Sequence, residues 1–145
     1  MLLRKTVGPL VLLALLAACS SDDSTNPETP NFAGNFAVAG TVNGSTTSDI
    51  TGTLAITNQQ GNQASVAFTV NLRTNGQVTQ TFATPSPVTA TLSSDGTISW
   101  QFTTTAQGVS VTLQNQGKLQ GDVITGTWSA TSLAGSFSGT FTATR

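Results

Sequence analysis

Residues 64–72, with the sequence Ala-Ser-Val-Ala-Phe-Thr-Val-Asn-Leu, place an apolar side chain at every second position from Val66 to Leu72. A two-residue period is typical of a strand with one face buried and the other in water. The same period recurs along the chain, at Ile50, Gly52, Leu54 and Ile56 and again at Ile98, Trp100 and Phe102. The intervening positions are mostly Thr, Ser, Asn and Gln, which suit a solvated sheet face. The pattern predicts an all-β domain.

Turn-forming residues separate these runs, among them Asn75-Gly76, Pro85-Ser86-Pro87 and Asp95-Gly96. The runs predict strands near 34–43, 49–57, 64–73, 77–84, 88–94, 97–105, 109–119, 122–131 and 135–144. Among these candidates we expect one or two to be fragments of a longer strand. Short strands joined by hairpins favour an antiparallel up-and-down β-barrel of about eight strands, with a β-sandwich as the alternative.

An internal repetition bears on how the sheet closes. The pattern apolar-x-Gly-Thr-apolar occurs at 38–42, 50–54, 124–128 and 137–141. If the last strand pairs with the first, these four segments become neighbours, and their glycines would form one inward wall. Glycine on an inward face allows sharp coiling or the close approach of another group. We expect a glycine-lined space opposite an aromatic wall; in a sandwich, the same Gly-Thr pairs would bend strands at corners.

Composition excludes several classes of function. The 145 residues include no His and no Tyr, and only 8% are charged, with Lys+Arg 5 against Asp+Glu 6. No basic field is available for nucleic acid, and no activated nucleophile or metal cluster can be assembled. The carboxylates Asp49, Asp95 and Asp122 stand at turns or at a strand start. We therefore predict a protein that is not an enzyme, with no catalytic residue, no metal and no cofactor.

The aromatic residues suggest a different kind of site. Trp100 and Trp128 lie in phase with the apolar rows, where they either line a pocket or fill the core. An eight-stranded barrel is wide enough to pack solid or to hold one small ligand. Gln80 is the polar member of an otherwise apolar row. The candidate residues for binding a small hydrophobic ligand are Phe68, Phe82, Trp100, Phe102, Trp128 and Gln80.

The amino-terminal segment has the three parts of an export signal. Arg4 and Lys5 precede an apolar run from Leu10 to Leu16, and small residues follow. This run is too short to span a membrane. Leu16-Ala17-Ala18-Cys19 then resembles the lipobox of bacterial lipoproteins.

The lipoprotein resemblance implies that residues 1–18 are a signal peptide and that Cys19 becomes the lipidated first residue of a membrane anchor. Two or three acyl chains hold a protein on a membrane, whereas one chain binds only marginally. Ser20 after the lipidated residue implies transport to the outer membrane. Residues 19–31 then form the lipidated cysteine and a disordered tether, and residues 32–145 form the barrel domain.

The domain itself resembles the lipocalin and avidin group of small barrels through Ile124-Thr125-Gly126-Thr127-Trp128. In that group the motif lies on the first strand, so the resemblance implies a fold and transfers no ligand residue. Our first hypothesis is an envelope lipoprotein that carries a small apolar ligand inside a lipocalin-like barrel. The alternative is a structural or interaction module of the cell envelope, with a solid core and a Thr/Gln/Asn surface that meets a protein partner.

Overall fold

A computed structural model describes residues 27–145. The predicted signal peptide and Cys19 lie outside these residues. The described chain forms nine antiparallel strands and no helix. Their bounds are β1 (Gly34–Thr41), β2 (Ser48–Gln60), β3 (Gln63–Thr74), β4 (Gln77–Ala83), β5 (Val88–Leu92), β6 (Thr97–Ala106), β7 (Val109–Gln120), β8 (Val123–Ser132) and β9 (Gly135–Thr144).

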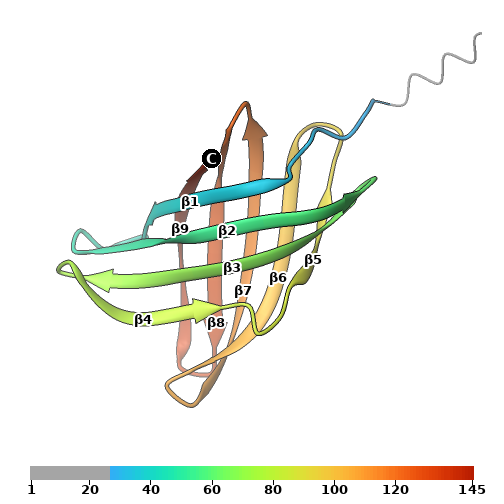
Figure 1. Cartoon of the computed structure of the whole chain (residues 1–145). Coiled ribbons are helices and arrows are strands. Elements are labelled where there is room, and N and C mark those ends of the chain that lie inside the picture. The colour runs from blue at the N-terminus through green and yellow to red at the C-terminus, as the bar shows by residue number, and fades with distance from the viewer. Residues whose placement is uncertain (1–26) are drawn as a thin grey trace, which may run out of the picture.

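The nine strands close into an eight-position barrel, as Figure 1 shows, with β1–β4 crossing in front of β5–β9. Closure depends on the pairing of β1 with β9, in which Gly40 stands opposite Phe141. The strands β4 and β5 share one position, because both pair with β3 at different ends. Pro85 and Pro87 lie in the break between them, where proline's missing N–H interrupts a ladder. The predicted barrel is confirmed, and the sandwich is excluded.

The four repeated Gly-Thr segments lie on neighbouring strands, in the order β2, β1, β9 and β8. Their glycines allow the strands to coil tightly. A Cβ added to Gly52 would collide with the carbonyl oxygen of Thr69, and one added to Gly126 would collide with that of Gln116. The expected glycine-lined space is therefore wrong, because backbone of adjacent strands and the Trp128 ring occupy it.

The core fills the barrel interior. The ring of the buried Phe68 lies 5.6 Å from that of Trp100 and 6.1 Å from that of Phe102, measured between centroids. Trp100 also meets the ring of Phe141 at 5.9 Å. These edge-to-face contacts add to the free energy gained by removing the rings from water. The apolar rows predicted from the sequence thus form one continuous core.

The chain enters the barrel through a small polar clamp. The Gln59 side chain on β2 accepts a hydrogen bond from the Phe32 backbone N–H at 2.8 Å and donates one to the Pro30 carbonyl at 2.8 Å. Phe32 itself is fully buried. The chain is therefore attached to β2 before β1 begins. Across residues 27–145, no helix is long and apolar enough to cross a membrane.

Candidate functional site

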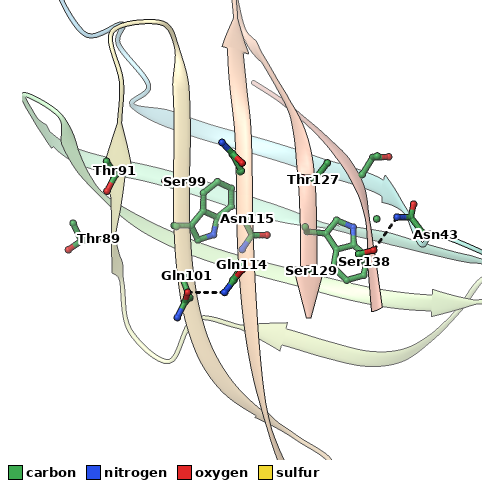
Figure 2. Close-up of a pocket in the computed structure, with 15 residues that line it drawn as sticks. Asn43, Thr89, Thr91, Ser99, Gln101, Gln114, Asn115, Thr127, Ser129 and Ser138 are labelled. Carbon is green, nitrogen blue, oxygen red and sulfur yellow. Dashed lines mark hydrogen bonds between the residues drawn. The ribbon is translucent and has the colours of Figure 1, made fainter. Parts of the chain in front are cut away.

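A wide concavity lies on the outside of the barrel. This outer groove, shown in Figure 2, has a volume of about 730 Å³ and crosses β5–β9. Its lining comprises Asn43, Thr89, Thr91, Ser99, Trp100, Gln101, Gln114, Asn115, Gln116, Thr127, Trp128, Ser129, Ser138, Gly139 and Thr140. None of these residues is charged. Trp100, Asn115, Trp128 and Gly139 are buried positions of their strands. The remaining lining consists of exposed or half-buried hydroxyl and amide side chains.

Strand register arranges these side chains in two rows across the sheet. One row runs from Thr91 through Ser99, Gln116 and Thr127 to Thr140, and the other from Gln101 through Gln114 and Ser129 to Ser138. Each row spans four or five strands, and neighbouring strands are about 4.8 Å apart. Each row therefore presents a regular series of hydrogen-bonding groups.

The row from Gln101 to Ser138 has a side-chain hydrogen bond at each end. Gln114 donates from Nε2 to Gln101 Oε1 at 3.3 Å, and Asn43 donates from Nδ2 to Ser138 Oγ at 3.1 Å. Because these bonds use few of the available donors and acceptors, the groove keeps much of its hydrogen-bonding capacity for a partner.

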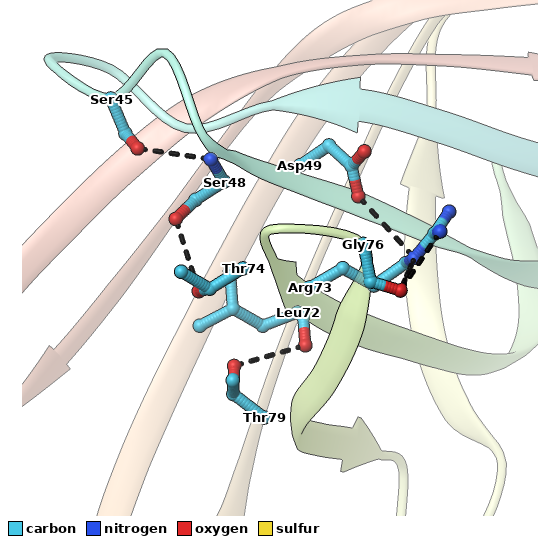
Figure 3. Close-up of polar contacts among 8 residues, drawn as sticks. All are labelled: Ser45, Ser48, Asp49, Leu72, Arg73, Thr74, Gly76 and Thr79. Carbon is cyan, nitrogen blue, oxygen red and sulfur yellow. Dashed lines mark hydrogen bonds and ion pairs between the residues drawn. The ribbon is translucent and has the colours of Figure 1, made fainter.

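The carboxylates predicted at turns do not converge on any site. Asp49 lies 3.8 Å from Arg73 Nε, in the polar cluster of Figure 3, where Arg73 also donates to the Gly76 carbonyl. Asp122 accepts from Arg145 Nε at 2.8 Å. Asp49 and Asp122 therefore each have their own arginine, and residues 27–145 contain no cluster of potential metal ligands.

Asp95 stabilises the turn between β5 and β6. Hydrogen bonds from the backbone N–H and then the hydroxyl of Thr97, at 3.0 and 2.9 Å, lower the pKa of the Asp95 carboxyl. The group is exposed and acts as a turn residue.

The structure brings five of the six predicted ligand residues into the barrel interior. Phe68, Phe82, Trp100, Phe102 and Trp128 are all at most 5% exposed. Three of them, Phe68, Phe82 and Trp128, line an interior cavity together with Ile50, Val70, Leu113 and Asn115. The cavity has a volume of about 10 Å³, which is enough for about one water molecule. The aromatic residues fill the core in this structure, and their role in ligand binding stays a prediction.

Gln80 lies elsewhere. It is half-buried, and its Nε2 donates a solvent-exposed hydrogen bond to the Thr81 carbonyl. Gln80 keeps the phase of Phe82 and pairs with Leu72, but it is only half-buried, and its role in ligand binding stays a prediction. A register irregularity between Leu72 and Arg73 and the exposure of Val78 show that the inward row ends beyond Phe82.

The polar residue inside the barrel is Asn115, which the sequence analysis missed. Its side chain is 4% exposed, and neither amide atom has a hydrogen-bond partner. The signal was available, because Asn115 continues the alternation of Val111 and Leu113 on β7. Gln80 gives the same signal, an amide residue in an apolar row with a two-residue period.

Comparison with known proteins yields two similar folds. No family model and no curated protein matches the chain. The solved structure of EF1p2_mFAP2b bound to DFHBI aligns with a TM-score of 0.60 and 12% identity, covering 78% of this chain and 92% of that one. A redesigned β-barrel, mFAP1, also bound to DFHBI, aligns with a TM-score of 0.51 and 16% identity, covering 78% and 94%. At these identities, the comparisons show that the chain has the fold of a small closed antiparallel β-barrel.

Proposed function

We propose that this protein is a non-enzymatic binding module of the bacterial cell envelope, attached to the outer membrane by a lipid on Cys19. The lipobox at 16–19 supports the anchor. The volume of the outer groove supports binding on the barrel exterior. Ligand sites usually measure about 300–1,000 Å³; the groove offers about 730 Å³, against about 10 Å³ in the interior.

The chemistry of the groove favours a neutral, hydroxyl-rich chain such as an extended polysaccharide. No charged side chain lines it, so neither an anionic nor a cationic ligand finds a counter-charge. Protein interfaces derive most of their binding energy from aromatic and arginine anchors; here both tryptophans are buried. Rows of amides and hydroxyls instead match a partner that forms many separate hydrogen bonds.

The groove can be tested with a matched pair of double variants. In the full-length protein in detergent, Gln114→Ala with Gln116→Ala removes two amides from the groove. Gln60→Ala with Gln120→Ala removes two exposed amides outside it. We expect the groove variant to lose about tenfold or more in affinity for neutral polysaccharides, since each lost hydrogen bond contributes about 0.5–1.5 kcal/mol. Equal affinities for the two variants would contradict the proposal.

The anchor has an independent test. Labelled palmitate should enter the wild-type protein in bacteria, and the Cys19→Ser variant should carry no label. Label that persists in this variant would remove the anchor from the proposal without affecting the groove.

A second candidate function is the transport of a small apolar ligand inside the barrel. Two observations favour it: the similar barrels are bound to DFHBI, and an unpartnered amide lies beside the interior cavity. In native mass spectrometry, the protein should then retain a small molecule, or fatty acids should raise its melting temperature. A protein that neither retains a ligand nor responds to fatty acids would leave the groove as the binding site.

A further inference from the structure

Asn115 is the buried polar side chain of the described core. Both its Nδ2 donor and its Oδ1 acceptor lack a partner, in an interior otherwise composed of apolar groups. An unpaired buried amide is unfavourable for folding, because the lost hydrogen bonds to water are not replaced. A native protein that retains such a group has a use for it or a partner for it.

The neighbours of Asn115 form the rest of a recognition surface. In the strand register, Asn115 stands opposite Trp100 on β6 and opposite Trp128 on β8. Trp128 Nε1 donates to the Thr41 carbonyl at 3.2 Å, whereas Trp100 Nε1 has no partner. Figure 2 shows the Asn115 side chain on β7, between the neighbouring strands β6 and β8. One acceptor and two kinds of free donor therefore lie together among aromatic rings.

The adjacent cavity is lined by a side chain on β4, a strand that is hydrogen-bonded along one edge. Phe82 lines the cavity from β4, and β4 has hydrogen-bonded pairing with β3 alone. On its other side β4 lies next to β6, and within residues 27–145 no strand pairing joins the two. Beyond Ser99, β6 pairs only with β7. Outward rotation of Phe82 would thus open the interior without breaking a ladder between β4 and β6.

We propose that Asn115 is the recognition residue of an interior site for a small flat aromatic molecule with an adjacent N–H and C=O, as in a lactam. Asn115 Nδ2 donates to the ligand carbonyl, and Asn115 Oδ1 accepts from the ligand N–H. Trp100 Nε1 donates to the second lone pair of the same carbonyl. The ligand enters between β4 and β6 and takes the place of the Phe82 ring. This inference deepens the second candidate function and is independent of the outer groove.

The test compares two probes of nearly equal shape, quinolin-2(1H)-one, which has the lactam edge, and naphthalene, which lacks it. Trp100 and Trp128 are the only two tryptophans and the chain has no tyrosine, so intrinsic fluorescence reports on the site directly. Binding is measured for the wild-type protein, for Asn115→Leu and for Phe82→Leu. Phe82→Leu keeps an apolar side chain at this position but makes it smaller, so the variant should still fold.

We expect the wild-type protein to bind the lactam at least tenfold more tightly than naphthalene. Asn115→Leu should abolish this preference, and Phe82→Leu should raise the affinity for both probes. An unchanged preference in Asn115→Leu would overturn the assignment of Asn115 while leaving an interior carrier in place. Failure of both probes to change the fluorescence of either the wild-type protein or Phe82→Leu would overturn the interior site itself. The polysaccharide assay tests the groove separately.

Discussion

Replacing Asn115 by leucine should make the fold more stable, although it removes a hydrogen-bonding residue. Two amide atoms are buried without partners, and each such atom costs about 1–3 kcal/mol. Leucine branches at Cγ as asparagine does, but it is larger and not planar, so imperfect packing beside Trp100 and Trp128 offsets part of this gain. We expect the free energy of unfolding to rise by about 1–3 kcal/mol.

Urea unfolding followed by tryptophan fluorescence measures this change. Because the urea dependence of small proteins is about 1–3 kcal/mol per molar, the midpoint should rise by about 1 M. Gln114→Leu is the matched control, since it places the same side chain on the exposed face at the next residue and should change stability by less than about 0.5 kcal/mol. A loss of stability in Asn115→Leu would show that the amide is satisfied in solution, and the reasoning about its unpaired atoms would be wrong.

Three further substitutions test other parts of the barrel. Gly126→Ala should destabilise the protein by about 1–3 kcal/mol, because the new Cβ would press on the Gln116 carbonyl; chemical denaturation showing a neutral effect would refute the tight coil. Arg145→Ala should lower the free energy of unfolding by about 1 kcal/mol, since it removes the ion pair with Asp122 and the cation–π contact with Phe36. This loss of stability should be smaller at high salt. Asp95→Asn should lower the free energy of unfolding near neutral pH and should have no effect on it in acid. Because the pKa of Asp95 is lowered, the ionised carboxylate stabilises the fold above the ordinary carboxyl range, and this effect is lost as pH falls through the lowered pKa. The urea midpoints of the wild-type protein and the variant should therefore converge in acid. A difference between the midpoints that stays the same in acid would contradict this.

The strands and their closure could be predicted because both depend on local patterns. Alternation such as that from Val66 to Leu72 sets which face of a strand is buried, and the repeated Gly-Thr segments favoured closure of the last strand on the first. The break between β4 and β5 also followed from local chemistry, since it contains Pro85 and Pro87. The alternation and the proline break are each decided within about ten residues.

The groove and the interior volume depend instead on distances between strands. Sequence periodicity assigns Gln114 and Ser129 to the outer face, but it contains no measure of the sheet curvature that brings their rows into a concave surface. It also does not tell whether the space beside an inward glycine is empty or filled by the next strand, as at Gly52. The same limit applies to Gln80 and Asn115. Both follow the inward alternation of their strands, and the sequence does not show where that alternation stops being buried. It therefore does not separate the half-buried amide of Gln80 from the buried amide of Asn115.

The Gln59 clamp has a mechanical consequence under the proposed membrane anchor. Any tension transmitted through residues preceding Phe32 first meets the two hydrogen bonds to Gln59 and the buried Phe32 ring. Behind them, β1 is bonded to β2 on one side and β9 on the other, so a pull along β1 would load both ladders in shear rather than peel one of them open. With the proposed anchor on Cys19, the barrel would therefore resist unfolding by a pull from its amino-terminal end.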